Sequence, residues 1–249
     1  MSSAGTRSLR PVAVIGAMAE EVERLRSGLH DAVTLLDAPF RVQRGTLAGV
    51  PVLLAECGVG KVNAAALTQF LVGQGARSCV FTGVAGATAQ DLEVGDVVIS
   101  DSAVQHDVDV TALGYAAGTV PGSPGSWLAD AELVALATAV ARTTAQRSAA
   151  DGSPPYRVKV GTVATGDQFI SSPERAADLR DQFGAVCAEM EGAACAQVCA
   201  AWGVPFVIVR SISDNANHTA DVDFRSFTKL AAERADRIVT GILEALADE

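Results

Sequence analysis

The stretch VIVRSISDNAN, residues 207–217, carries an apolar run that ends on charged groups. Val207 to Val209 are typical of a buried strand, and they are followed by Arg210 and then by Asp214. An aspartate after a strand is often only the cap of the next element. A carboxyl group partly removed from water, however, binds its proton more tightly, which is how proteins obtain a general acid near neutral pH. Asp214 is therefore a candidate acid, with Arg210 placed to hold a second carboxylate or a water.

Two further pairs of carboxylates follow apolar runs. GAMAEE places Glu20 and Glu21 in the first turn of an expected helix, where acids are ordinary. We interpret Glu20 as solvated and Glu21 as a group that faces a groove above the sheet. CAEMEG places Glu189 and Glu191 two residues apart in an extended segment. Alternation directs them to opposite sides, so that one serves a site while the other supports the structure.

Alternating strand-like and helix-like runs must position these groups. The patterns predict strands at 12–16, 79–86, 94–101, 157–166 and 205–214, a hairpin over 40–57, a strand leading into a helix over 186–203, and helices at 19–29, 61–75, 129–148 and 223–247. Such alternation indicates an α/β fold with a mostly parallel or mixed sheet, whose ligands bind at the carboxyl ends of strands. Residues 116–156, which include the helix at 129–148, are predicted to form a long surface excursion.

Glycines mark the same strand ends, at positions 58, 60, 83 and 86. They allow a backbone to approach a ligand closely, but tight strand–helix turns also use them, and both interpretations stay open. Neither a Walker lysine pattern nor a dinucleotide fingerprint is present. The three histidines (30, 106 and 218) do not cluster in the sequence, which argues against a Ser-His-Asp or His–metal mechanism.

Composition and charge limit the kinds of molecule that this protein is expected to bind. The 249-residue chain is 49% apolar with a net charge of −10 and no cluster of Lys and Arg, which argues against nucleic acid. No window approaches the ~20 apolar residues of a membrane span. Residues 1–10 are expected to be a disordered tail before one domain at 11–249, and early acidic residues argue against a signal peptide.

Five cysteines without a CxxC pair predict buried free thiols in a reducing cytoplasm. Cys195 and Cys199 lie one helical turn apart without a histidine, so we interpret them as core packing and expect no metal site.

Seven motifs, in order and spacing, give a family resemblance. VIGAMAEEVERL, GVGKVNAA, FTGVAGA, VGDVVISDSAVQHDVDVTALGY, ATGDQFI, AEMEGAACAQVC and PFVIVRSISDNA resemble those of the bacterial 5′-methylthioadenosine/S-adenosylhomocysteine nucleosidases, of the purine nucleoside phosphorylase superfamily, over residues 11–247. The resemblance implies a single α/β domain with a mixed, barrel-like central sheet flanked by helices, and a homodimer. It also implies hydrolysis of 5′-substituted adenosines to adenine and a thioribose, in methionine salvage and S-adenosylmethionine recycling, without metal or organic cofactor.

The resemblance also assigns roles to single residues. Asp214 would protonate adenine N7 with help from Ser213, and Glu21 would activate the attacking water with Arg210 nearby. The chemistry fits without the family, because an N-glycosidic bond breaks when its base is protonated, and anionic groups stabilise the resulting oxocarbenium character. The resemblance implies that Met190 and Glu191 contact the ribose and that Phe169 stacks on the base. It implies that the backbone of Ile170 binds the adenine edge. Val84, Ala85 and Gly86 would line the bottom of the substrate pocket. Further substrate-binding candidates are Met18, Val59 and Glu189.

One segment, HDVDVTALGYAAGTVPG at 106–122, is apolar enough to mark an interface if it is exposed. The resemblance implies that it crosses to the neighbouring subunit of a two-fold dimer and lends Val110, Leu113 and Tyr115 to the partner's site. Three positions depart from the family pattern, namely Leu113 in place of an aromatic residue, Val84 in place of a serine and Asn217 in place of an acid. The first two leave the preferred substrate open.

Three other functions remain as alternatives. A phosphorylase of the same superfamily needs arginines at the early glycine loop, where this chain has Glu20 and Glu21. A futalosine or aminodeoxyfutalosine hydrolase is compatible with the sequence. A non-catalytic relative that only binds nucleosides is disfavoured, because Asp214, Glu21 and Glu191 are all present.

Overall fold

The computed structural model describes residues 10–216 and 220–247. The predicted tail, apart from Arg10, and Asn217 lie outside these residues. Arg10 donates hydrogen bonds to the carbonyls of Gly75 and Ala76, at 3.1 and 3.3 Å. No helix of the described part of the chain is both long and apolar enough to cross a membrane.

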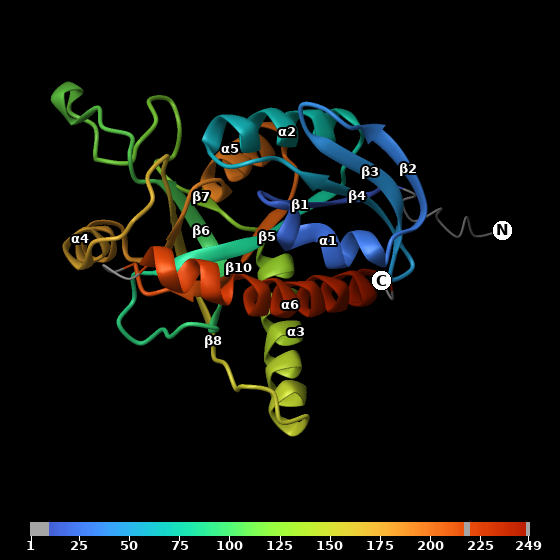
Figure 1. The fold of residues 1–249 in the computed structure, drawn as a ribbon. Coiled ribbons are helices and arrows are strands. Elements are labelled where there is room, and N and C mark those ends of the chain that lie inside the picture. The colour runs from blue at the N-terminus through green and yellow to red at the C-terminus, as the bar shows by residue number, and fades with distance from the viewer. Residues whose placement is uncertain (1–9, 217–219, 248–249) are drawn as a thin grey trace.

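The strands form one mixed sheet, shown in Figure 1. Their bounds are β1 Val12–Gly16, β2 His30–Leu36, β3 Arg41–Leu47, β4 Val50–Glu56, β5 Ser78–Ala87, β6 Val97–Gln105, β7 Trp127–Leu128, β8 Val158–Thr165, β9 Ala185–Glu189 and β10 Phe206–Asp214. The order is β10-β6-β8-β9-β5-β1-β4-β3-β2, with β7 paired to β6. Because β10 also pairs with β5, the strands β10, β6, β8, β9 and β5 close on themselves as a barrel. The expected barrel-like mixed sheet in a single α/β domain is confirmed.

Helices cover both faces of this sheet. On one face lie α1 (Ala19–Ser27), α3 (Ala131–Ala150) and α6 (Ala220–Ala247), and on the other lie α2 (Lys61–Gly73) and α5 (Gly192–Trp202). A separate apolar core fills each side, and Leu25, Ala137 and Ile242 represent the first while Leu67 and Ala196 represent the second. The parallel strands β1, β4, β5 and β10 end at the same edge, which is where the sequence placed its carboxylates.

Four elements escaped prediction, including the one-turn 3₁₀-helix Thr111–Leu113, and one segment was misjudged. Strand β2 is mostly exposed, so it lacks a period-two apolar pattern, and β7 has only two residues. Helix α4 (Pro173–Phe183) has readable end signals, because Ser172 caps it and Gly184 ends it in the left-handed region. The prediction of a surface excursion over 116–156 is wrong for its second half. There, α3 buries Leu133 and Ala141 against α6 and the sheet.

Candidate active site

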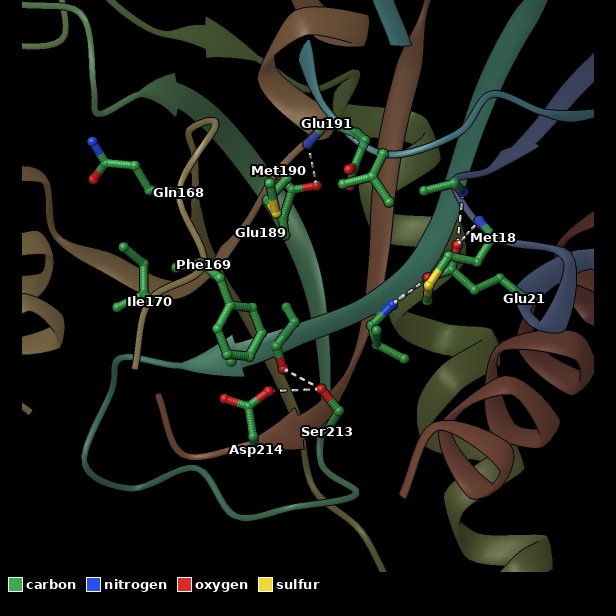
Figure 2. Close-up of a pocket in the computed structure, with 16 residues that line it drawn as sticks. Met18, Glu21, Gln168, Phe169, Ile170, Glu189, Met190, Glu191, Ser213 and Asp214 are labelled. Carbon is green, nitrogen blue, oxygen red and sulfur yellow. Dashed lines mark hydrogen bonds between the residues drawn. The ribbon is translucent and has the colours of Figure 1, made fainter. Parts of the chain in front are cut away.

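A cavity of about 310 Å³ lies at the strand ends and is shown in Figure 2. Its size is within the range of pockets that bind small organic ligands. Figure 2 shows Phe169, Ser213 and Asp214 on one side, Met18 and Glu21 on the opposite side, and Glu189 to Glu191 between them. The lining consists of Ala17, Met18, Glu21, Val59, Val84, Ala85, Gly86, Gln168, Phe169, Ile170, Ala188, Glu189, Met190, Glu191, Ser213 and Asp214.

The end of β10 is shaped to present Asp214. The parallel register of β10 with β5 shifts between Ile212 and Asp214, so Ser213 is an extra residue in the ladder. Bulges of this kind redirect side chains next to binding sites. The facing residue is Gly86, and a Cβ there would lie 2.7 Å from Asp214 Oδ1. Glycine is therefore required for the carboxyl to reach this position.

Asp214 is held by two hydrogen bonds within its own turn. Ser213 Oγ lies 2.9 Å from Oδ2, and the backbone N–H of Ala216 donates to Oδ1 at 2.9 Å. Ser213 Oγ also lies 3.4 Å from the carbonyl oxygen of Ala85. The carboxyl is 2% exposed, yet it lines the cavity. Asp214 thus combines the capping role that a strand-end aspartate commonly has with direct access to a bound molecule.

Glu21 reaches the opposite side of the cavity from the first turn of α1. Its Oε2 accepts hydrogen bonds from the backbone N–H groups of Ala17 and Met18, at 2.7 and 2.9 Å, and its Oε1 accepts from Val84 at 3.1 Å. Burial raises the pKa of this carboxyl above its ordinary value, although Arg210 and the three N–H groups oppose the shift. Glu20, its neighbour, is exposed as expected.

Arg210 lies behind the cavity and forms a buried ion pair with Glu189, which lines it. Arg210 Nη2 donates to Glu189 Oε2, and its Nη1 donates to the carbonyl of Thr82 at 3.1 Å. Its guanidinium also packs over the ring of Phe81, 4.8 Å from the centroid. Burial disfavours the charged guanidinium, but Glu189, Glu191 and Glu21 outweigh this effect and hold its pKa above the usual value. Arg210 is therefore the central cation among three carboxylates.

Glu189 and Glu191 have different hydrogen-bond partners, although both line the cavity and do not point to opposite sides as alternation predicted. Glu189 accepts hydrogen bonds from the Thr165 hydroxyl and from the N–H groups of Glu191 and Gly192, at 3.2 and 2.8 Å to Oε2. Glu191 accepts from the N–H of Gly60 at 2.9 Å and lies 3.8 Å from Arg210. Burial and the nearby charge of Glu189 raise the pKa of Glu191 to about 8. Glu189 is thus the supporting carboxylate, and Glu191 is the one with spare acceptor capacity.

The structure brings together nearly all the substrate-binding residues that the sequence predicted. Arg210 is the exception, because its side chain is completely buried and is not part of the lining; it contacts carboxylates and holds them in place. Val110, Leu113 and Tyr115 also lie outside the cavity of their own chain, as a partner-lending segment requires. The sequence reasoning missed Ala17, Gln168 and Ala188. Gln168 lies within the ATGDQFI motif and could have been found there, whereas the two alanines carry no chemical signal.

Comparisons with known proteins agree with this arrangement. Residues 11–244 match the model of the phosphorylase superfamily. The 5′-methylthioadenosine/S-adenosylhomocysteine nucleosidase of Geobacillus thermodenitrificans is 43% identical over 93% of this chain and 95% of its own length. The protein of the same name from Bacillus cereus strain G9842 is 44% identical over 94% and 99%.

Solved structures give the same result. The Neisseria meningitidis nucleosidase of that name, in complex with methylthio-immucillin-A, has a TM-score of 0.88 and 40% identity, over 95% of this chain and 100% of that one. A futalosine hydrolase mutant of Helicobacter pylori reaches a TM-score of 0.85 at 30% identity, over 95% and 100%. Sequence identity, coverage and fold therefore agree that this chain belongs to the phosphorylase superfamily and, within it, to the 5′-methylthioadenosine/S-adenosylhomocysteine nucleosidase family.

Proposed function

We propose that this protein hydrolyses the N-glycosidic bond of 5′-substituted adenosines, namely 5′-methylthioadenosine, S-adenosylhomocysteine and 5′-deoxyadenosine, and releases adenine. Asp214 and Glu21, on opposite sides of one cavity with Glu191 between them, support this assignment. The arrangement provides a general acid for the adenine, a carboxylate for the sugar and a general base for the attacking water. The reaction would serve methionine salvage and S-adenosylmethionine recycling in the cytoplasm, and the residues assigned to it need no cofactor.

Asp214 would act on the adenine as the general acid. Ser213 Oγ donates to Asp214 Oδ2 and the N–H of Ala216 donates to Oδ1, each at 2.9 Å, so donors for a carboxylate at this position are already in place. Transfer of a proton from Asp214 to adenine N7 would make the base a neutral leaving group, and these two donors would stabilise the new carboxylate. The ring of Phe169 is on the same side of the cavity, where it can stack on the base.

The water side belongs to Glu21. A carboxylate has about four acceptor positions, and the N–H groups of Ala17, Met18 and Val84 occupy three of them. The remaining one can bind the attacking water, and burial makes this carboxylate a stronger base. Glu191 would accept hydrogen bonds from the ribose hydroxyls and stabilise the developing positive charge on the sugar.

One observation favours hydrolysis over phosphorolysis. The backbone N–H groups at the ends of β1 and β5 would suit a bound anion, but the carboxylate of Glu21 already occupies them. Of the described residues that line the cavity, none is Arg or Lys, and Arg210 behind it is engaged by Glu189. A phosphate ion would face uncompensated negative charge there.

The test is release of adenine with and without phosphate. Equal rates in both, with free thioribose as the second product, are expected. A requirement for phosphate together with accumulation of a sugar 1-phosphate would contradict the proposal. Because a futalosine hydrolase of similar structure is known, futalosine and aminodeoxyfutalosine belong in the same panel. Faster turnover of either than of 5′-methylthioadenosine would move the assignment to that class.

We also propose that the active form is a homodimer whose sites are completed by the partner. The segment 107–126, green in Figure 1, stands away from the body of the molecule. Leu113 and Tyr115 on this segment, and Val62 and Trp202 on α2 and α5, are large apolar side chains left exposed. Exposed apolar groups of this size mark interaction surfaces. A two-fold dimer would bury them and place the segment over the partner's cavity.

Complementation tests this shared site. Asp214→Asn and a Tyr115 substitution severe enough to abolish activity are prepared separately and mixed under conditions that let subunits exchange. One site of the mixed dimer then carries both defects and the other carries neither, so activity should return from two inactive parents. If mass measurements show exchange but activity stays absent, Tyr115 serves its own chain.

A further inference from the structure

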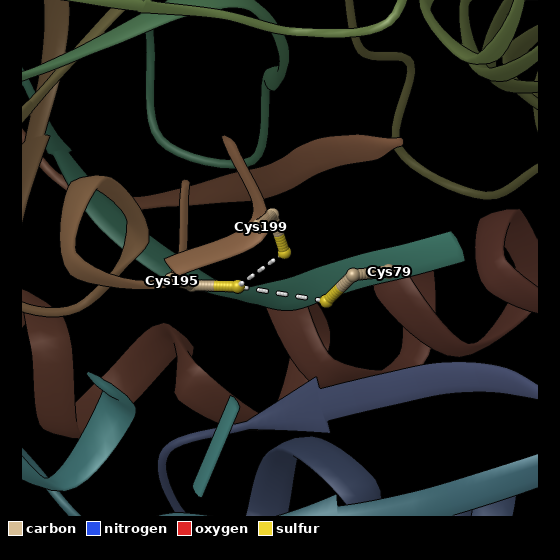
Figure 3. A group of neighbouring side chains, drawn as sticks. All are labelled: Cys79, Cys195 and Cys199. Atoms are coloured by element: carbon tan, nitrogen blue, oxygen red, sulfur yellow. Dashed lines mark hydrogen bonds between the residues drawn. The ribbon is translucent and has the colours of Figure 1, made fainter. Parts of the chain in front are cut away.

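Three buried cysteines meet on the α5 side of the sheet, outside the catalytic cavity, as Figure 3 shows. Cys79 begins β5, whereas Cys195 and Cys199 lie one turn apart on α5. The Sγ atoms of Cys79 and Cys195 are 3.5 Å apart, and those of Cys195 and Cys199 are 3.9 Å apart. All three sulfurs lie within 4.8 Å of one another. Cys195 and Cys199 were interpreted as core packing because no histidine lies near them in the sequence, and the third thiol is 116 residues distant from Cys195.

These distances suit one atom bonded to three sulfurs. A central atom about 2.3 Å from each sulfur, the length of a metal–thiolate bond, needs sulfurs roughly 3.4 to 4.0 Å apart. The three thiols therefore need only small side-chain adjustments to bind it. The cysteines are free, so every sulfur is available as a ligand.

The charge of the complex decides which atom fits. All three cysteines are completely buried or nearly so, in an apolar core that includes Leu67, and a buried net charge is costly. Three thiolates around Cu⁺ or Zn²⁺ leave a net negative charge, whereas three around a trivalent centre leave none. Structural zinc also takes four ligands, and within the described residues this cluster offers three of His, Cys, Asp or Glu.

We propose that Cys79, Cys195 and Cys199 form a trithiol site for a trivalent thiophilic metalloid, for which arsenous acid is the probe. The reaction is As(OH)₃ + 3 Cys–SH → As(S–Cys)₃ + 3 H₂O. Three As–O bonds break, three As–S bonds form, each thiol proton leaves in a water molecule, and arsenic stays trivalent without an oxidant. Cys195 is the middle sulfur of the cluster, because its Sγ lies 3.5 Å from that of Cys79 and 3.9 Å from that of Cys199.

The site is closed in the folded protein, and this determines its kinetics. Arsenous acid reaches the sulfurs only when α5 opens locally from the sheet. Binding should therefore be slow, with a rate that stops rising at high arsenite concentration. Once bound, arsenic links β5 to α5, and it should raise the melting temperature of the reduced protein because it binds the folded state.

The experiment uses the full chain, reduced and then incubated with arsenite and freed of excess. We expect one arsenic per chain, a native mass increased by one arsenic minus three protons, and an arsenic X-ray absorption spectrum with three sulfur neighbours. Cys199→Ala should reduce arsenic retention at least tenfold. Cys187→Ala is the matched control, since Cys187 is equally buried and lies outside the cluster, and it should bind as the wild type does.

Several outcomes would overturn the proposal. These are a wild-type protein that retains no arsenic, a spectrum with oxygen in place of a sulfur, equal loss in Cys187→Ala, or zinc retained as firmly as arsenic. If Cys199→Ala does not fold, the sulfur count and the mass of the wild-type complex decide by themselves. The result does not depend on the nucleosidase assignment, because none of these readouts involves turnover.

Discussion

The floor and the rim of the cavity differ in how completely one chain builds them. The floor consists of Glu21, Glu191 and Asp214, each at most 5% exposed and each held by backbone N–H groups. The rim consists of Val59 and Phe169, each about half exposed in the single chain. The groups assigned to the reaction are positioned within one chain, whereas the half-exposed rim is where the proposed dimer would add contacts to the 5′-substituent.

The floor and the rim also differ in charge. Three carboxylates of the floor region surround the single guanidinium of Arg210, so their charges are not all balanced. Burial is the largest cause of the raised pKa values of Glu21 and Glu191, and Arg210 opposes it in both. The rim consists of apolar side chains, so its contribution to substrate binding depends on how much apolar area the substrate buries against it. Substitutions in the floor should therefore change kcat, and those at the rim should change KM.

Asp214→Asn should have the largest effect. Asparagine keeps the shape but cannot transfer a proton to the base, so we expect kcat to fall by about 10³–10⁴-fold, at the upper part of the range for a positioned general acid. Binding of 5′-methylthioadenosine, measured by calorimetry, should stay within about tenfold of the wild type. Near-normal turnover would remove Asp214 from the mechanism.

Glu21→Gln should follow, with a loss of about 10²–10³-fold in kcat. The amide cannot accept a proton from water, and its NH₂ group would oppose the N–H groups of Ala17 and Met18. Glu20→Gln is the matched control, because it makes the same change on the adjacent exposed residue and should leave kcat within twofold. Equal losses in both variants would mean that the helix N-terminus, and not the water, is what Glu21 serves.

The sequence revealed the floor because its residues carry chemical signals. Asp214 and Glu21 follow apolar strands, and both line the cavity, whereas alternation predicted opposite sides for Glu189 and Glu191, which line it together. Arg210 holds a second carboxylate, as predicted, but nothing in the sequence says whether a charge at a strand end points into a cavity or behind it. Only the closing of the barrel places this side chain next to Glu189, 21 residues earlier.

Other features depended on contacts between distant segments. The meeting of Cys79 with α5 follows from the pairing of β5 within the barrel, which no local pattern encodes. Strand β2 was missed because an exposed edge strand has no buried face to create alternation. Helix α3 was predicted at 129–148, but its packing against the sheet was missed because its apolar residues are mostly alanines, which pack well but give a weak periodic signal.

Glu191→Gln tests the charge balance of the floor through stability. The pKa of Glu191 is about 8 in the folded protein, against an ordinary 4.5. Below about 4.5 both folded and unfolded states hold the proton; between the two values only the folded state does, so the wild type loses stability as pH rises toward 8. Glutamine does not titrate. The melting temperature of the variant, relative to the wild type, should therefore increase between pH 5 and pH 8, whereas that of Glu20→Gln should stay level. A constant difference for Glu191→Gln would contradict the raised pKa.

Leu113→Ala should have the smallest effect and should show it at the rim alone. Leu113 is 73% exposed on the single chain, so its loss costs the fold little. If it covers the partner's 5′-substituent, losing three carbons (one methine and two methyl groups), worth at most ~0.8 kcal/mol each when fully buried, should raise KM for 5′-methylthioadenosine by about 10- to 60-fold. The value of kcat should be unchanged, because the floor is intact. Adenosine, whose 5′-hydroxyl offers no apolar surface, is the control substrate, and its KM should change less than twofold. Equal changes for both substrates would mean that Leu113 acts on the shape of the whole site, and the division between floor and rim would then be wrong at this residue.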